Sequence, residues 1–275
     1  ALKRWGCETV ELYCDSNPDF PNHHPDPVEP KNLTDLIETV KKTGADLGIA
    51  FDGDGDRLGV VDEKGGILWG DRLMILFWRE ILPRFPGSEA LVEVKCSDTL
   101  VREIERLGGK PVYHRTGHSH IKKTMRARQL LFAGEMSGHM FFRDEYFGFD
   151  DALYAAGRLL RILSHDDRPL SELLADVPMK PVTPETRVPL PETVTDRAAL
   201  VERLAAWFRE RGREVIDVDG VRAVYPGGWG LVRCSNTQPI LVLRAEGESE
   251  AQLAEIKTEL EEALRAAGLD AAVNW

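Results

Sequence analysis

The sequence has few cysteines, no long apolar run and a shortage of basic side chains. Its four cysteines among 275 residues form no C-x-x-C pair, which argues against a disulfide scaffold or a zinc site and favours reduced, structural thiols. No apolar stretch approaches the ~20 residues that span a bilayer. The opening, ALKRWGCETV, also lacks the apolar core and cleavage site of a secretion signal. We therefore expect a cytoplasmic protein without a membrane partner.

The charge balance restricts the partners further. With 46 acidic and 35 basic side chains the net charge is −11, and a field of that sign repels nucleic acid. An anionic substrate would therefore need a local basic pocket.

The apolar fraction of 43% is large enough for hydrophobic cores. At about 150 residues per domain, the length suggests two or three domains.

Hydrophobic periodicity predicts two α/β units followed by a small α+β domain. Short β-rich runs alternate with helical patterns up to residue 164, beginning with a strand at 9–14, a helix at 32–44 and strands at 45–51 and 58–62. A proline-rich stretch then predicts a linker. Beyond it we expect a strand, a helix at 196–212, two or three strands of an antiparallel sheet, and a closing helix at 249–268.

These patterns divide the chain into three predicted domains. They cover residues 1–66, 67–178 and 179–275. The first residues resemble the end of a helix and its glycine stop, with no preceding strand for that helix to cover. We therefore expect the first α/β unit to be truncated.

An acidic loop predicts a metal site. Asp52, Asp54 and Asp56 alternate with glycines directly after an apolar strand, so a tight turn can direct three carboxylates at one hard cation. Without a cation, the three charges would repel one another and raise each other's pKa. Arg57 adds a fixed positive charge for a phosphoryl oxygen, so we predict a magnesium and phosphoryl-transfer site.

An EF-hand calcium loop is the competing interpretation of this acidic segment. Asp52, Asp54, Asp56 and Glu63 fall at the first, third, fifth and twelfth positions of such a loop. The sixth position, which requires glycine, is however Arg57. The flanking segments are also patterned as strands, whereas an EF-hand has helices there, so we reject calcium storage.

Two further loops carry chemistry. Glu135, Ser137 and His139, separated by a methionine and a glycine, offer an acceptor, a hydroxyl and a titratable group that could hold a polyol and move a proton. A polar turn and a Ser–His nucleophile pair are the alternatives, although no nucleophile elbow surrounds the serine. The third loop combines a guanidinium, two hydroxyls and an amide suited to phosphate, or else it is a simple hairpin turn. Its residues are Arg233, Ser235, Asn236 and Thr237.

Isolated basic residues between these loops give little evidence of function on their own. Lys95 follows a predicted strand, and His118 lies at a strand-to-helix turn; open α/β sheets place ligands at such strand ends. His23, His24 and Asp26 could suggest a second metal site. The surrounding prolines instead favour a rigid loop whose imidazoles cap backbone groups.

Taken together, the sequence resembles the α-D-phosphohexomutase superfamily, most closely bacterial phosphomannomutase/phosphoglucomutase. The segments that carry the resemblance occur in order along nearly the whole chain: FPNHHPDP, ADLGIAFDGDGDR, VKC, RTGHS, GEMSGHMFF, FGFDD and RCSNTQP. It implies the end of a second α/β domain, a complete third domain and a last domain with a TATA-binding-protein-like fold. It also implies a reversible transfer of phosphate between O1 and O6 of a hexose through a bisphosphorylated sugar.

The resemblance also implies roles for the loops. Asp52, Asp54 and Asp56 match magnesium ligands, with a phosphoserine oxygen expected as a further ligand. Residues around the transferring phosphate and the reacting hydroxyl would be Arg57, Lys95, His118 and His139. Sugar hydroxyls would contact Glu135 and Ser137, and the phosphate that does not react would be bound by Arg233, Ser235, Asn236 and Thr237. Whether His139 or Lys95 is the general base stays open.

One departure from the family limits this interpretation. Family members carry the phosphoserine in a Ser-His-Asn-Pro loop of the first domain, and that sequence does not occur here. The implied partners are therefore a segment that supplies the phosphoserine, and hexose phosphates: mannose or glucose 1- or 6-phosphate and glucose 1,6-bisphosphate. We expect the chain alone to be inactive. The alternative function is a non-catalytic phosphosugar-binding module or fragment.

Overall fold

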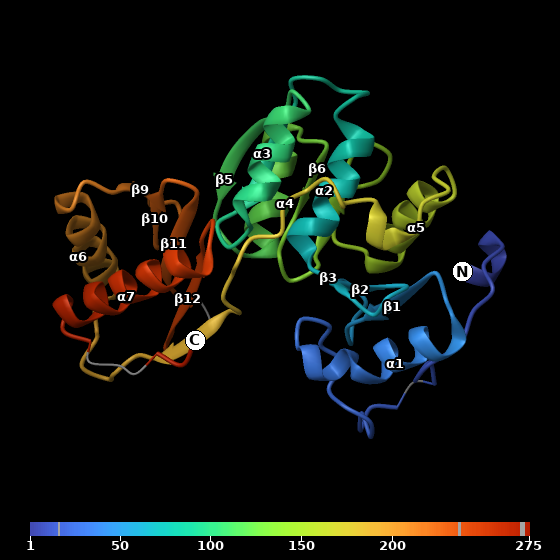
Figure 1. Ribbon diagram of the computed structural model, residues 1–275, viewed down its shortest axis with the longest axis horizontal. Coiled ribbons are helices and arrows are strands. Elements are labelled where there is room, and N and C mark those ends of the chain that lie inside the picture. The colour runs from blue at the N-terminus through green and yellow to red at the C-terminus, as the bar shows by residue number, and fades with distance from the viewer. Residues whose placement is uncertain (16, 236–237, 270–272) are drawn as a thin grey trace. The chain divides into compact units, whose positions relative to one another are not determined.

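The structure is a computed structural model that describes residues 1–15, 17–235, 238–269 and 273–275. This part of the chain forms two compact units. The first contains Ala1–Val92, Thr99–Val112 and Gly117–Val177, and the second contains Glu93–Asp98, Tyr113–Thr116 and Pro178–Trp275. Helices and strands alternate in the first unit, whereas the second is built on an antiparallel sheet (Figure 1). The predicted fold class, α/β followed by α+β, is confirmed.

The first sheet positions the acidic loop. It has the order β1-β2-β3, formed by Leu47–Phe51, Leu58–Asp62 and Ile67–Leu68, and all its pairs are antiparallel. Helix α1 (Thr34–Thr43) contributes Val40 to a small core with Val61. Because β1 and β2 pair directly, the residues that join them form a hairpin loop.

The predicted strand at 9–14 is wrong, because the structure has irregular chain there. Val10 and Tyr13 are exposed, and Tyr13 donates a hydrogen bond to Asp35 instead of lying in a sheet. A strand pattern becomes a strand only where another strand pairs with it. Among the described residues none pairs with this segment.

The remaining elements up to residue 177 follow the predicted alternation. They are α2 (Gly70–Ile81), β4 (Glu89–Glu93), α3 (Asp98–Arg106), β5 (Lys110–His114), α4 (His118–Arg128), β6 (Phe132–Gly134), β7 (Met140–Phe142) and α5 (Ala152–Leu163). Most of α2 is buried, and its Phe77 packs edge-on against Phe132 and Phe142 at ring distances of 5.6 and 4.9 Å. The three-residue strand β7, which pairs with β6, was not predicted.

The second unit is a five-stranded antiparallel sheet covered by two helices. Its strand order is β8-β12-β11-β10-β9, and helices α6 and α7 pack on one face over a core that includes Val221, Leu243, Phe208 and Ile256 (Figure 1). Four strands lie between the helices, not the predicted two or three, because the short edge strand β9 was missed. The elements are β8 (Thr186–Pro189), α6 (Arg197–Glu210), β9 (Glu214–Ile216), β10 (Val221–Tyr225), β11 (Gly228–Cys234), β12 (Ile240–Glu246) and α7 (Glu250–Ala266).

The other face of this sheet is covered by the segment Glu93–Asp98. Val94 packs with Trp229 and Leu231, all buried. The guanidinium of Arg222, fully buried and 3.7 Å from the Trp229 ring, donates hydrogen bonds to the carbonyls of Val94 and Cys96. A buried cation requires such acceptors, because desolvation would otherwise be costly. The segment that carries Lys95 is thereby fixed to the sheet.

Candidate functional site

The acidic loop occupies the β1–β2 hairpin. One carboxylate oxygen from each of Asp52, Asp54 and Asp56 lies within 4.8 Å of the others. Asp52 is buried, and its Oδ1 accepts the backbone N–H groups of Asp56 and Arg57, both at 3.0 Å. These bonds hold the carboxylate at the base of the loop. The flanking strands also rule out an EF-hand, which has helices on both sides.

The electrostatics of this loop are those of a cation site. Burial raises the pKa of Asp56; the charge of His139 opposes this, while Asp52 and Asp54 raise the pKa further. For Asp52 burial also acts upward, but bonds from Arg57 outweigh it and lower the pKa. Three clustered oxygen donors that crowd one another suit a hard divalent cation such as Mg²⁺. The donor set therefore fits the predicted metal.

Arg57 is tied to two carboxylates. Its Nε donates to Asp52 Oδ2 at 2.5 Å, and its Nη1 donates to Asp26 Oδ1 at 2.9 Å. Asp26 lies in the proline-rich loop, where His23 Nδ1 lies 2.9 Å from the His24 carbonyl, as expected for an imidazole that caps the backbone. The partnership of Asp26 with Arg57 was not foreseen, because 31 positions separate the two residues.

Main-chain hydrogen bonds join the acidic loop to the loop that contains Glu135, Ser137 and His139. The N–H of Leu58 donates to the Gly138 carbonyl at 3.0 Å, and Arg57 lies opposite His139 in an antiparallel bridge. Gly138 has φ +96°, and a Cβ there would lie 2.5 Å from the Leu58 carbonyl oxygen. Only glycine fits this crossing without strain.

His139 lies between the two loops. Its Nδ1 is 3.1 Å from Glu135 Oε2 and 3.0 Å from Ser137 Oγ, and its Nε2 is 3.3 Å from Asp56 Oδ1. Burial alone would lower its pKa, but the hydrogen bond to Glu135 and nearby carboxylate charges raise it. This imidazole therefore retains a proton more readily than a free histidine. Glu135 also accepts the N–H of Gly117 at 2.7 Å, which fixes its orientation.

His118, at the start of α4, is held by Asp150 and Lys122, to which the sequence analysis gave no role. Its Nδ1 is 3.1 Å from Asp150 Oδ2 and 3.2 Å from Lys122 Nζ. Lys122 in turn donates to Asp150 at 2.7 Å. The rings of His118 and His139 stack with centroids 5.4 Å apart. The FGFDD segment was the available signal for Asp150, but no spacing rule pointed to its partner.

Lys95 belongs to the second unit and is buried. Its ammonium lies 3.0 Å from Glu185 and 3.9 Å from Glu93. Burial would raise the pKa of Glu185, but the charge of Lys95 and its hydrogen bond lower it. This pairing, across 90 positions, fixes the lysine side chain in place.

The predicted phosphate-binding loop joins β11 to β12. Arg233, at the end of β11, is buried and donates from Nε to Asp219 at 2.9 Å. The N–H of Ser235 donates to the Ile240 carbonyl at 2.9 Å, and its Oγ accepts the N–H of Gln238 at 3.3 Å. The loop is thus a hairpin turn preceded by a fixed arginine. Asn236 and Thr237 lie outside the described residues.

The predicted residues consequently fall into two sets. The first unit brings together Asp52, Asp54, Asp56, Arg57, His118, Glu135, Ser137 and His139. The second unit contains Lys95, Arg233 and Ser235.

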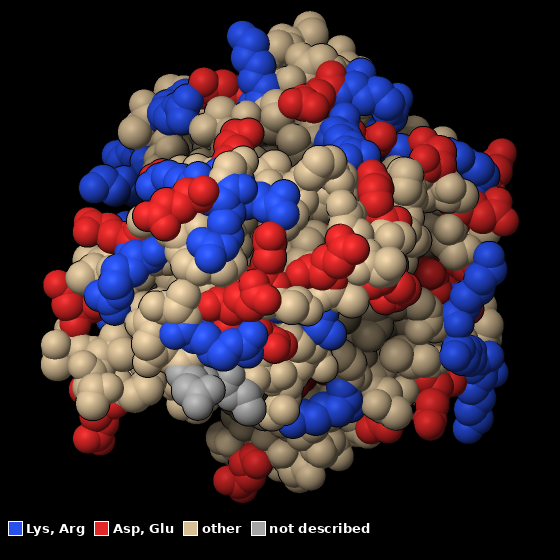
Figure 2. All heavy atoms as spheres, turned by 60° about the vertical axis from the view of Figure 1, so that its left-hand side comes forward, with Lys and Arg blue, Asp and Glu red and all other residues tan. Residues whose placement is uncertain are grey.

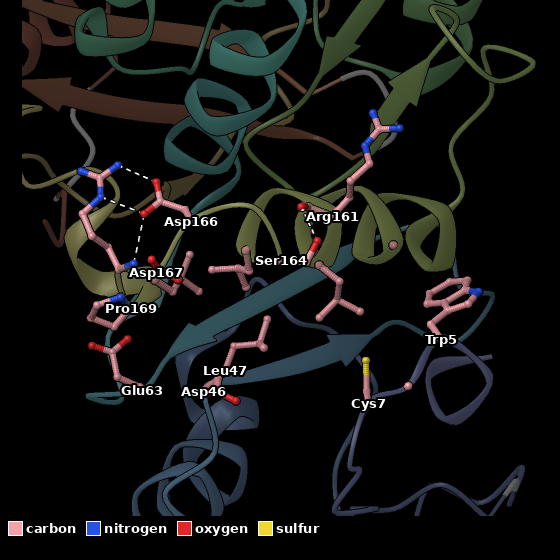
Figure 3. Close-up of a pocket in the computed structure, with 16 residues that line it drawn as sticks. Trp5, Cys7, Asp46, Leu47, Glu63, Arg161, Ser164, Asp166, Asp167 and Pro169 are labelled. Carbon is pink, nitrogen blue, oxygen red and sulfur yellow. Dashed lines mark hydrogen bonds and ion pairs between the residues drawn. The ribbon is translucent and has the colours of Figure 1, made fainter.

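A separate hollow in the first unit lies beside α5. It is lined by Trp5, Leu47, Glu63 and Arg161 among others, and Trp5 packs on Gly157 of the helix (Figure 3). Asp166 is paired with Arg168, and Glu63 accepts hydrogen bonds from Ser171. No described residue of the predicted site lines this hollow.

The fold and the two sets of residues define a multidomain α/β protein with a carboxylate cation loop and a basic hairpin. Three models of one family match the chain in order: phosphoglucomutase/phosphomannomutase α/β/α domain II at residues 1–66, α/β/α domain III at 69–180 and the C-terminal domain at 185–263. The chain belongs to the phosphoglucomutase/phosphomannomutase family.

Individual relatives agree with this assignment. The phosphomannomutase/phosphoglucomutase of Pseudomonas aeruginosa is 48% identical over 267 residues, which cover 96% of this chain and 57% of that protein. The phosphoglucomutase of Neisseria meningitidis serogroup A is 47% identical, covering 94% and 56%. A solved structure, a phosphoglucomutase/phosphomannomutase family protein from Burkholderia thailandensis, matches with a TM-score of 0.91 and 45% identity, covering 99% and 58%. The chain thus spans a little over half the length of these relatives.

Proposed function

We propose that this chain is the metal-binding and sugar-binding part of a magnesium-dependent phosphohexomutase. The reaction is the reversible transfer of a phosphoryl group between O1 and O6 of mannose or glucose through a bisphosphorylated sugar. The observation that carries the proposal is the direct contact between the acidic loop and His139, in a chain that three models of the family match in order. Charge stabilisation and proton transfer are the two requirements of phosphoryl transfer to a hydroxyl.

Each loop has a proposed role. Asp52, Asp54 and Asp56 would hold Mg²⁺, which when bound would offset the charge of the phosphoryl oxygens. Arg57 is fixed by Asp26 and supplies a further positive charge beside them. Glu135 and Ser137 orient the sugar hydroxyls.

We assign proton transfer to a basic side chain, either His139 or Lys95. His139 presents Nε2 to the acidic loop; burial acts to lower its pKa, but the hydrogen bond to Glu135 and nearby carboxylates raise it. Lys95 is the other candidate for the reacting hydroxyl, and His118 lies beside His139. Arg233 and Ser235, with Asn236 and Thr237, would bind the phosphate that does not react.

The phosphoryl donor is proposed to come from outside these residues. We propose three domains, 1–66, 67–178 and 179–275, which bind ligands but depend on a phosphoserine segment for turnover. A donor must reach near-attack distance, so a segment that does not dock cannot restore activity.

A coupled assay of mannose 1-phosphate conversion to the 6-phosphate, with magnesium and glucose 1,6-bisphosphate present, tests this proposal. The chain alone should show no sustained turnover. Activity should appear when it is combined with the part of the Pseudomonas aeruginosa relative that it does not match. Sustained turnover by the chain alone would show that one of its own residues carries phosphate.

The alternative is a phosphosugar-binding module without catalysis, which the buried Arg233 of the β11–β12 hairpin supports equally well. It predicts that glucose 1-phosphate binds in calorimetry but that no added segment produces the 6-phosphate. Absence of both binding and turnover in a folded chain would contradict both proposals.

A further inference from the structure

We propose a second metal site, for Zn²⁺ or a similar first-row transition ion, formed by Asp56, His118, His139 and Asp150. One donor atom from each of these four side chains lies within 4.8 Å of the other three. Two imidazole nitrogens and two carboxylate oxygens are a donor set suited to zinc or cobalt, whereas Mg²⁺ prefers oxygen alone. The site shares only Asp56 with the acidic loop.

The spacing of the donors fits tetrahedral coordination. Zinc ligands at about 2.0–2.1 Å from the ion in a tetrahedron are separated by about 3.3 Å. The distance from His118 Nδ1 to Asp150 Oδ2 is 3.1 Å, and from His139 Nε2 to Asp56 Oδ1 it is 3.3 Å. The remaining pairs of donor atoms lie within 4.8 Å, so side-chain rotation must bring them closer together around one ion.

Glu135 also orients His139, because it faces the ring nitrogen that would not bind the ion. His139 would coordinate through Nε2, while its Nδ1 faces Glu135 Oε2 at 3.1 Å. Metal-bound histidines generally donate their second ring N–H to such a carboxylate, which fixes the ring and increases its basicity. Glu135 is itself held by the N–H of Gly117 at 2.7 Å, so this support is rigid.

Lys122 is the group that a metal ion must displace. Its ammonium lies 2.7 Å from Asp150 Oδ1 and 3.2 Å from His118 Nδ1. It is therefore a cation already placed beside half of the donor set. Its side chain is one-third exposed, so it can turn into solvent when the ion binds.

The proposed site has a functional consequence. An ion there would occupy His139 Nε2 and draw Asp56 away from the acidic loop, so it would oppose both proton transfer and magnesium binding. Zinc-class ions would consequently inhibit the protein through residues outside the Asp52 and Asp54 pair. The binding itself does not depend on the proposed mutase activity.

The test uses Co²⁺ as the probe on the full chain at neutral pH with excess Mg²⁺ present. We expect the intense visible absorption of four-coordinate Co²⁺, bleached by Zn²⁺ at one equivalent. His118→Ala and Asp150→Asn should abolish this absorption. Asp54→Asn and His120→Ala, which change the acidic loop and an exposed neighbouring histidine, should retain it.

Lys122→Met gives an independent result. Removal of the competing cation should tighten Co²⁺ binding by roughly fivefold. The proposal is overturned if the absorption is that of six-coordinate Co²⁺. It is equally overturned if the absorption survives in His118→Ala, or if Lys122→Met weakens binding, with circular dichroism showing that each variant is folded.

Discussion

Four basic side chains of the candidate site are each held by a carboxylate that lies 14 or more positions away in the sequence. The pairs are Arg57 with Asp26, Lys95 with Glu185, His118 with Asp150 and Arg233 with Asp219. Such partners restrict the rotamers of these side chains. These carboxylates also compete with an anionic ligand for the same basic side chains. The measured affinity for phosphate therefore includes the cost of displacing a carboxylate.

At the residue scale, the acidic loop makes a direct prediction about metal binding. Asp54 is the exposed member of the three carboxylates, so Asp54→Asn should preserve the fold while removing one charged ligand. We expect Mg²⁺ affinity to fall about tenfold or more in calorimetric titration. Asp46→Asn, outside the loop, is the control. Equal affinity in Asp54→Asn and the unchanged chain would remove the metal assignment.

Arg233 should contribute most of the affinity for phosphate among the described residues of the β11–β12 hairpin. A charge-assisted bond contributes about 1.5–3 kcal/mol, against about 1 kcal/mol for a neutral hydroxyl. Arg233→Ala should therefore weaken glucose 1-phosphate binding by more than Ser235→Ala does, as measured by calorimetry. Arg209→Ala on α6 should have no effect. An Arg233→Ala chain that binds as tightly as its parent would contradict the role of this loop.

At the element scale, one glycine controls how two loops cross. Gly138→Ala would place a Cβ 2.5 Å from the Leu58 carbonyl oxygen, so it should lower the free energy of unfolding by about 1–3 kcal/mol and also weaken Mg²⁺ binding. Gly212→Ala is a matched control, because φ there is +73° but nothing lies within 4 Å of the added atom. If urea denaturation shows the same loss of unfolding free energy in both variants, the contact with Leu58 does not contribute to stability.

The ion pairs of Glu145, which join the segment after β7 to α5, should stabilise the fold to a degree that depends on pH. Hydrogen bonds from Arg84 and then Arg161 lower its pKa from 4.5 to about 2. A lowered pKa means that the folded state binds the proton less well than the unfolded state does. This stabilisation is therefore complete above about pH 5 and is lost as the pH falls towards 2.

Unfolding of the parent and of Glu145→Gln at a series of pH values measures this effect. The parent should be the more stable at pH 7, by a modest margin because the pair is partly exposed. The difference should shrink steadily in acid. A difference that stays constant with pH would mean that packing, and not charge, explains the effect of the substitution.

Most helices and the long strands could be predicted from sequence, because apolar periodicity reports which face is buried. The failures share a cause. The segment at 9–14 has a strand pattern but no partner strand among the described residues, while β7 and β9 are three residues long and owe their pairing to neighbours. Local pattern cannot report a partner that lies far away in the chain.

The candidate site shows the same division. Asp52, Asp54 and Asp56 could be recognised because they are adjacent in sequence and their crowding has one simple explanation. Asp26 and Asp150 could not, since nothing local to either residue indicates the arginine or histidine that it holds. Prediction from sequence therefore named side chains that lie together in the structure and missed most of the carboxylates that hold them.

At the scale of the whole molecule, the linear boundaries proposed from the sequence stay a prediction. The second compact unit includes Glu93–Asp98 and Tyr113–Thr116 from the middle of the chain, since Val94 covers Trp229 and Leu231. A reading along the sequence assigns these segments to the preceding domain. Contacts in space assign them to the sheet that they cover.

Acidic and basic side chains are both present on the surface, as the composition of the sequence predicts (Figure 2). Acidic and basic side chains are interspersed on the face drawn in Figure 2, without separation into large fields of one sign. Among the described residues, no helix has both the length and the apolarity to cross a bilayer.

The backbone bond between Leu58 and Gly138 has a consequence for how this family can diversify. Because main-chain atoms set the spacing of the two loops, the side chains at positions 136 and 137 can be exchanged while the bond between Leu58 and Gly138 is kept. Under the proposed role of Ser137 as a sugar contact, such exchanges would alter sugar preference while the acidic loop keeps its geometry. The proposed role therefore gives the protein engineer a place to test sugar preference, provided that position 138 stays glycine.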